Sequence, residues 1–249
     1  MGHWEIFLFF LIIAFIYSSV GFGGGSSYLA VLAMYSLPYQ EIRLTALICN
    51  IIVVIGGVFI YIKNNQVEWK KILPLTLISV PMAYLGAVLK ISQEFFFLTL
   101  GITLIIAALL LWIKTGTKNN GEISGNTGNS LLRNGFLGCG IGFLSGLVGI
   151  GGGIFLSPLL NLMKWDTPRK IAATSSIFIL VNSVSGIFGQ LSKLSSDIDY
   201  FMILSLCFAV FIGGQIGSRM SLKWNPLLIK RMTAVLVLVA GINVLIKYW

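Results

Sequence analysis

Charged side chains are scarce in this sequence. Only 10% of its 249 residues are Asp, Glu, Lys or Arg, whereas 57% are hydrophobic. A soluble domain carries roughly 25% charged residues, so this chain could not cover a water-exposed surface. The composition predicts an all-α, multi-pass membrane protein whose main solvent is the lipid bilayer.

The side chains on which most enzymes depend are also few. The chain has one histidine, His3, and eight acidic residues, all near the ends of apolar runs. The three cysteines, Cys49, Cys139 and Cys207, are widely spaced within apolar runs, which favours small buried side chains over a disulfide framework or a zinc site. No group of residues has metal-ligand spacing. The sequence therefore predicts no enzyme, no metal and no other cofactor.

Long uncharged runs define the expected membrane segments. The N-terminal MGHWEIF lacks the features of a signal peptide, so we expect the first apolar segment to remain. Six runs have a length that suits one membrane helix each, the last with help from its flanks: 44–62, 72–89, 95–113, 171–192, 200–218 and 232–246.

Two further uncharged runs, 6–40 and 134–163, are too long for one helix. Two full crossings of the bilayer core would need about 60 Å, whereas a helix as long as the first of these runs reaches only about 52 Å. Each long run thus forms either a hairpin of two shortened helices or a helix with a re-entrant stub.

The same glycine block, G-x-G-G-G, interrupts both long runs. It occurs in VGFGGGSSYLAVL (20–32) and in GLVGIGGGIFLSP (146–158), and Thr45 and Thr174 follow the two blocks at matching places. Internal duplication is common in secondary transporters. We predict a first membrane repeat at 1–113, a polar Gly/Asn/Ser/Thr linker at 114–130 and a second membrane repeat at 131–249.

The positions of Lys and Arg distinguish the two models of the long runs, the hairpin of two shortened helices and the helix with a re-entrant stub. With five crossings per repeat, Lys and Arg divide 13 to 4 between the two sides, whereas with four crossings they divide 8 to 9. Cytoplasmic loops are enriched in Lys and Arg, which favours ten segments. An odd number per repeat predicts two inverted five-segment repeats, each with a helical hairpin broken at a G-x-G-G-G tip, and both termini on the extracytoplasmic side. The net charge of +9 follows from this bias, and nothing predicts nucleic-acid binding.

Each glycine block precedes a helix that we expect to begin inside the membrane. The first amides of such a helix lack intrahelical partners and, with the helix dipole, favour an anion. In an inverted repeat the two tips meet near the midplane, so we interpret the blocks as a two-part anion site. The alternative is close helix packing. Packing is the favoured role of five other glycines, which have four-residue spacing: Gly138, Gly142, Gly146, Gly213 and Gly217.

Polar side chains in and after the re-entering helices would supply further donors. The candidate substrate-binding residues are Gly23, Gly24, Gly25, Ser26, Ser27, Asn50, Gly151, Gly152, Gly153, Ser175, Ser176 and Asn182. Ser175 and Asn182 lie two turns apart on one helix face. Hydroxyls that bond back to their own helix, and asparagines that bridge helices, are the alternative. No acid lies in mid-span, so no buried carboxylate relay for proton coupling is visible.

The two glycine motifs also indicate a family. GFGGGSSYL, followed by Thr45, and GLVGIGGGIFLSP, followed by ATSS at 173–176, resemble the sulfite exporter TauE/SafE family over nearly the whole chain. Its members are duplicated membrane proteins associated with sulfite and organosulfur anions. In one departure from symmetry, Pro158 of the second motif aligns with Ala30 of the first.

The resemblance implies a plasma-membrane secondary transporter of small sulfur-containing oxyanions, sulfite or organosulfonates, with export as the expected direction. We expect alternating access with the anion held at the glycine tips near the midplane. Two alternatives stay open: an anion channel with the same site, and a membrane scaffold whose glycines only pack helices. The oligomeric state is left open.

Overall fold

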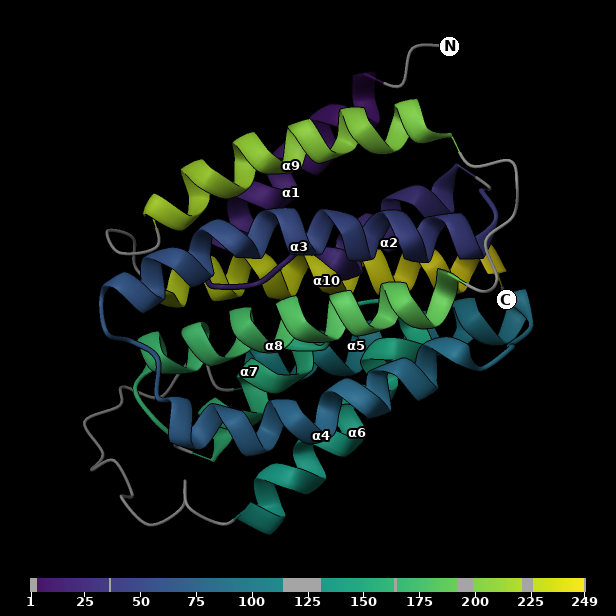
Figure 1. Cartoon of the computed structure of the whole chain (residues 1–249). Helices are drawn as coiled ribbons and strands as arrows, with labels where there is room; N and C mark the ends of the chain where they lie inside the picture. The colour runs from purple at the N-terminus through teal and green to yellow at the C-terminus, as the bar shows by residue number, and fades with distance from the viewer. Residues whose placement is uncertain are drawn as a thin grey trace.

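The regular structure of the described chain is helical throughout. The computed structural model describes residues 4–35, 37–113, 131–163, 165–191, 199–220 and 226–248, so the expected linker 114–130 lies outside the described residues. The helices within these ranges (Figure 1) are α1 (Trp4–Ser18), α2 (Gly25–Met34), α3 (Tyr39–Lys63), α4 (Trp69–Val88), α5 (Gln93–Ile113), α6 (Leu131–Val148), α7 (Gly153–Leu162), α8 (Pro168–Gln190), α9 (Tyr200–Met220) and α10 (Pro226–Tyr248).

The expected membrane fold is confirmed at the level of its helices. Five of them, α3, α4, α5, α8 and α9, are long and apolar enough to cross a bilayer, and α1, α2, α7 and the end of α10 are shorter apolar helices. Each of the six shorter uncharged runs corresponds to one helix. The chain is therefore an all-α, multi-pass membrane protein.

Each of the two long uncharged runs contains two helices. α1 ends at Ser18 and α2 begins at Gly25, while α6 ends at Val148 and α7 begins at Gly153, so both breaks fall at the glycine blocks. Gly24 and Gly152, which directly precede α2 and α7, have φ angles of 88° and 80°. Residues with a Cβ rarely adopt this left-handed conformation. The backbone itself therefore requires glycine at these two positions.

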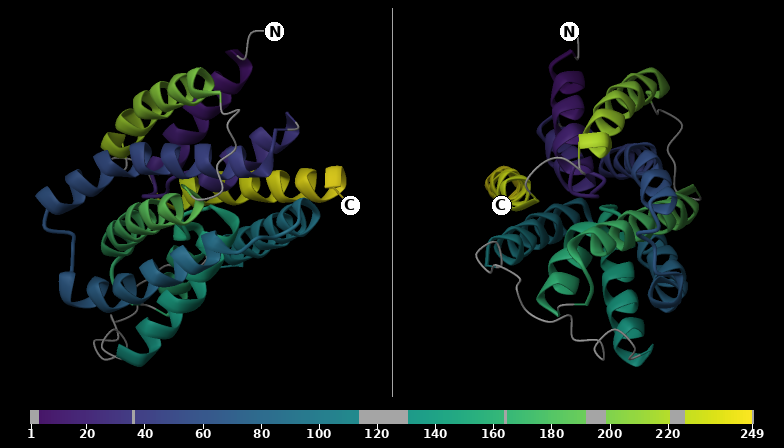
Figure 2. Two further views of the ribbon diagram at one scale, coloured as in Figure 1. Left: turned by 45° about the vertical axis from the view of Figure 1, so that its right-hand side comes forward. Right: turned by 90° about the vertical axis from the view of Figure 1, so that its left-hand side faces the viewer.

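Helices from the two halves of the chain alternate in the bundle. α4 packs on α6 along one side and α1 on α9 along the opposite side, with α3 and α8 side by side between them (Figures 1 and 2). By their order in each half, the counterparts are α1 and α6, α2 and α7, α3 and α8, α4 and α9, and α5 and α10. Exchanging every helix for its counterpart turns the α4–α6 pair into α9–α1 and leaves the α3–α8 and α5–α10 pairs unchanged. The α3–α9 and α4–α8 pairs are exchanged in the same way. The arrangement of helix pairs is thus the same from either half.

Glycines allow α4 and α6 to approach closely. A Cβ added at Gly142 would lie 2.6 Å from the Ser79 carbonyl oxygen, and one at Gly146 would overlap the Ala83 carbonyl oxygen of α4. Gly213 and Gly217 meet the Leu11 and Phe15 carbonyl oxygens of α1 in the same manner. The packing role predicted from their four-residue spacing is confirmed.

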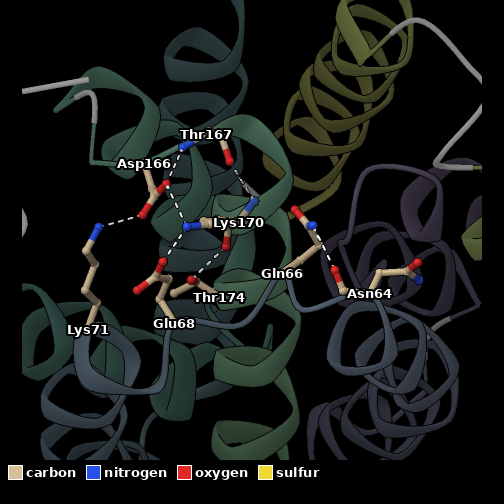
Figure 3. A network of polar contacts seen from close by, with 8 residues as sticks. All are labelled: Asn64, Gln66, Glu68, Lys71, Asp166, Thr167, Lys170 and Thr174. Carbon is tan, nitrogen blue, oxygen red and sulfur yellow. Dashed lines mark hydrogen bonds and ion pairs between the residues drawn. The ribbon is translucent and has the colours of Figure 1, made fainter. Parts of the chain in front are cut away.

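Two polar clusters join the halves at opposite ends of α3. Near its C-terminal end, the Lys71 ammonium lies 2.6 Å from the Asp166 carboxylate, and Lys170 pairs with Glu68 (Figure 3). Near its N-terminal end, the Asp199 amide donates to the Glu41 carboxylate at 3.3 Å. At that same end, α10 reaches α2.

Lys247 and Tyr248 of α10 make the contact with α2 near the N-terminal end of α3. The Lys247 ammonium donates to the Ala33 and Met34 carbonyl oxygens at 2.9 and 2.8 Å, and the Tyr248 hydroxyl donates to Ala33 at 2.9 Å. These carbonyls lie at the C-terminus of α2, where intrahelical donors are lacking. A cation there is also favoured by the helix dipole.

Gly146→Ala is expected to separate α4 from α6, because the added methyl group would overlap the backbone of Ala83. Overpacking of this kind typically costs about 1–3 kcal/mol. The matched control is Gly140→Ala on the same helix, where a Cβ would meet no atom within 4 Å. There the better helix propensity of alanine should stabilise the protein by up to about 1 kcal/mol. Thermal unfolding of the detergent-purified variants measures both effects. Equal midpoints would contradict close α4–α6 packing.

Candidate functional site

Each glycine-containing turn rests on the third helix of the other half. A Cβ added at Gly21 would lie 2.9 Å from the Ala172 carbonyl oxygen of α8, and one at Gly149 would lie 3.2 Å from Cγ of Arg43 on α3. Gly21 and Gly149 each begin a glycine block, and Arg43 and Ala172 each stand two positions before the matching threonine of their repeat. The two contacts are therefore equivalent positions of the duplicated sequence, and each broken hairpin is held by the opposite half.

Asn50 of α3 contacts both glycine blocks. Its side chain is fully buried, and Nδ2 donates to the Ile150 carbonyl oxygen at 2.9 Å. An added Cβ at Gly23 or Gly25 would overlap the Asn50 amide, and one at Gly151 would lie 2.9 Å from its Nδ2. The two blocks thus meet around one asparagine, in a space that residues with a side chain would fill.

α8 supplies the opposite wall of this meeting point. Cγ2 of Ile179 lies 3.2 Å from a Cβ added at Gly23 and 2.9 Å from one at Gly151. The hydroxyl of Ser183 lies 3.0 Å from the same Gly151 position. Ile179 is the counterpart of Asn50, because each stands five positions after the matching threonine of its repeat. The site is therefore asymmetric, with an amide on the α3 side and an isoleucine beside a hydroxyl on the α8 side.

The helices α2 and α7 start at this meeting point, and no side chain caps the N-terminus of either helix. In α2 the first bonded amides are those of Ser27 and Tyr28, both to the Gly24 carbonyl oxygen at 3.0 Å, and in α7 Phe155 and Leu156 bond to Gly152 in the same way. No atom of the described residues accepts from the amides that precede them, those of Gly25, Ser26, Gly153 and Ile154. Such free amides and the positive end of the helix dipole form an environment suited to an anion.

Several side chains of α3, α6 and α8 are buried without a hydrogen-bond partner among the described residues. These polar atoms are Asn50 Oδ1, Ser145 Oγ, Ser175 Oγ, both amide atoms of Asn182 and Ser183 Oγ, and every one of these residues is 0% exposed. A buried polar group left unpaired costs about 1–3 kcal/mol. Ser175, Asn182 and Ser183 belong to the same helix as Ile179. A polar ligand bound here would relieve that cost.

Other candidate residues have local partners instead. Ser26 and Ser27 lie 3.3 and 2.6 Å from the Tyr17 hydroxyl, which joins α1 to α2. The Ser176 hydroxyl donates to the Gly21 carbonyl oxygen at 2.9 Å and to Ala172 at 3.0 Å. These three hydroxyls brace the first broken hairpin.

The remaining candidates are glycines whose added side chain would meet protein. A Cβ at Gly24 would lie 2.8 Å from the Tyr28 ring, and one at Gly152 would lie 2.8 Å from the Phe178 ring. One at Gly153 would overlap the Ile179 side chain. All three positions therefore allow close packing around the meeting point.

Besides Ile179, the residues near the glycine blocks that were not sequence candidates include Ser183, Ser145 and Arg43. Ser183 follows Asn182 directly, and that adjacency was a usable signal. Ser145 lies in α6, where its Cβ is 3.1 Å from a Cβ added at Gly152. Arg43, counted from the sequence only as a basic residue at the end of a span, is 3% exposed and donates from Nη2 to the Gly146 carbonyl oxygen at 2.7 Å. That contact spans 103 positions of the chain, so no local pattern indicates it.

Within the described ranges, no group of three or more His, Cys, Asp and Glu side chains could hold a metal ion. The donors that converge at the glycine blocks are backbone amides, amide side chains and hydroxyls. Such neutral donors can bind an oxyanion without a metal.

Comparison with known proteins assigns the chain to a family. The family model described as sulfite exporter TauE/SafE matches residues 6–244. The chain belongs to this family. Two relatives bear the name probable membrane transporter protein: y4hK of Sinorhizobium fredii, 28% identical over 95% of both chains, and YunE of Bacillus subtilis, 25% identical over 90% of both. No solved structure matches the chain. The resemblance to TauE/SafE is thus confirmed, and the protein is a membrane transporter of this family.

Asn50→Ala is expected to lower the free energy of unfolding by about 1–3 kcal/mol, because the buried Ile150 carbonyl oxygen loses its donor. Asn182→Ala is the matched control, since this asparagine is equally buried and both its amide atoms lack a described partner. Asn182→Ala should leave the thermal stability unchanged or raise it. The prediction fails if the two variants lose equal stability in detergent.

Proposed function

We propose that this TauE/SafE transporter carries small sulfur-containing oxyanions, sulfite or organosulfonates, across the plasma membrane by alternating access. The observation that carries the proposal is that two uncapped helix starts meet at Asn50, beside buried polar atoms of α8 that lack described partners. Export is the direction that the family description suggests.

The chemistry of the meeting point favours an anion. Two helix N-termini bring partial positive charge and free amides to one place. The acidic side chains of the described residues lie toward the ends of the helices. A sulfite or sulfonate group presents several oxygens, each of which can accept from an amide or a hydroxyl. Neutral donors also suit a carrier, because an anion held without a fixed countercharge is released more readily.

The two polar clusters support ten crossings in inverted repeats. Ion pairs between 68–71 and 166–170 require both segments on one side of the membrane. Ten crossings place them there, whereas eight crossings place them on opposite sides. The contact between Glu41 and the amide of Asp199 at the other end leads to the same choice. We therefore assign the 68–71 and 166–170 segments to the cytoplasmic side and both termini to the extracytoplasmic side.

Inverted repeats offer a physical route to alternating access. If the halves adopt two slightly different conformations, exchanging these conformations between the halves opens the site to the opposite side. The equivalent helix pairs of the two halves, such as α1–α9 and α4–α6, provide interfaces over which this exchange can occur. The glycine blocks stay at the centre in both arrangements.

A binding panel tests the substrate class. Sulfite, thiosulfate, sulfoacetate, taurine, sulfate and chloride would each be added to purified protein and the unfolding midpoint recorded. A ligand at about 100 times its dissociation constant adds roughly 2.7 kcal/mol of stability. We expect this with sulfite or a sulfonate, and we expect Asn182→Ala to abolish the shift without lowering the ligand-free midpoint. Absence of a shift with every anion would refute the anion site at the glycine blocks.

Flux into proteoliposomes then separates a carrier from a channel. Sulfite flux that saturates, and that is accelerated by unlabelled sulfite on the opposite side, is expected of alternating access. Flux that rises linearly with concentration and shows no such exchange would contradict a carrier and favour the channel.

Cysteine labelling tests the proposed topology. In a variant that lacks the natural cysteines, Lys90→Cys and Lys70→Cys would each place one thiol at an exposed position. A membrane-impermeant maleimide should label Lys90→Cys in intact cells and Lys70→Cys only after permeabilisation. The reverse pattern would contradict the assignment of the 68–71 segment to the cytoplasmic side, and labelling of both in intact cells would exclude an odd number of crossings between them.

A further inference from the structure

Arg43 is a buried cation without an acidic partner among the described residues. The residue is 3% exposed, and the ion pairs of the described chain involve other residues. An unpaired charge in a low-dielectric interior is costly. Ionisable residues within membrane spans are therefore rare and usually have a functional role.

The protein holds the Arg43 guanidinium in place but leaves part of it unused. Nη2 donates to the Gly146 carbonyl oxygen, near the negative C-terminal end of α6, and the guanidinium carbon lies 5.9 Å from the centre of the Phe96 ring. Nε has no partner in the described chain. The group is thus fixed by dipoles and a ring, none of which carries a full negative charge.

The register of α3 and α8 places Gln190 level with Arg43. A Cβ added at Gly186 would lie 3.1 Å from Cδ1 of Leu47, while Asn50 and Ser183 both contact the Gly151 position. Residue numbers therefore increase in opposite directions along the two helices (Figure 1). Arg43 lies one turn before Leu47 on the same face, and Gln190 lies one turn after Gly186.

Gln190 is a second buried group without a partner. It is 3% exposed, and neither Oε1 nor Nε2 forms a hydrogen bond with any described residue. A guanidinium and an amide at one level, both with free donors, match the oxygens of a sulfite or sulfonate group. One anion between them would neutralise Arg43 and occupy the free donors of both.

We propose that Arg43 and Gln190 form a second anion subsite, about 10 Å along α3 from Asn50 toward the N-terminal end of that helix. The inference rests on the proposed function, since the subsite takes the same oxyanion on its way to or from the glycine blocks. It lies on one approach only, because the counterpart of Arg43 in the other half is Ala172. In the proposed topology this is the extracytoplasmic approach.

Sulfite flux at subsaturating concentration, per amount of folded protein in proteoliposomes, tests the subsite. Arg43→Gln should lower this flux by about tenfold or more, the usual effect of removing one partner of a buried charge-assisted contact. Arg43→Lys should restore part of it. Gln190→Leu should lower the flux severalfold although the ligand-free protein is at least as stable as the wild type, because the glutamine makes no described hydrogen bond.

Lys247→Gln is the matched control for a purely structural role. Lys247, like Arg43, donates to carbonyl oxygens near the C-terminus of a helix at the same end of the bundle. Its removal should lower thermal stability and leave sulfite flux per folded protein unchanged. Arg43→Gln should keep the sulfite-induced thermal shift, whereas Asn182→Ala should lose it.

Unchanged flux in Gln190→Leu, or in a folded Arg43→Gln protein, would overturn the subsite and leave Arg43 as a cap of α6. If Arg43→Gln does not fold, Gln190→Leu decides alone. Failure of the proposed function gives a different result, since the wild type would then show neither sulfite binding nor sulfite flux.

Discussion

The arrangement depends on how the backbone is satisfied at the two breaks, between α1 and α2 and between α6 and α7. In a bilayer, an exposed amide or carbonyl group costs several kcal/mol, so each break must be covered by protein or by a bound ligand. Side chains of the opposite half provide the cover: Asn50 donates to Ile150, Arg43 to Gly146 and Ser176 to Gly21. This mutual support explains why α3 and α8 lie at the centre and why the halves alternate around them.

Much of the fold follows from local features of the sequence. Charge-free runs of a given length determine the number and position of helices, and the G-x-G-G-G blocks determine where two of these are broken. The five glycines with four-residue spacing, including Gly142 and Gly146, mark helix faces that pack closely. Such features can be predicted because they depend on length, periodicity and backbone conformation within a few turns.

The partners of individual polar side chains could not be predicted in this way. Ser26 and Ser27 were equal candidates with Asn50, yet they bond to Tyr17 whereas Asn50 reaches the other half. The difference depends on how α1, α2 and α3 pack, which a linear pattern does not record. The same holds for Arg43, whose carbonyl partner is 103 positions away. Side chains of identical chemistry therefore acquire different roles from tertiary contacts alone.

The alternation of the halves also has a consequence for biosynthesis. α1 packs on α9, so a helix that ends at Ser18 meets its main neighbour only after Tyr200 and the residues that follow it have been made. Until then the short first hairpin, with its glycine turn, lacks the cover that α8 later provides at Ala172. The nascent first half must consequently remain in an incompletely packed state, shielded by lipid or by the insertion machinery, for most of translation. The α4–α6 and α3–α8 pairs can form earlier, so the packing of α1 against α9 is among the last contacts of the bundle to form.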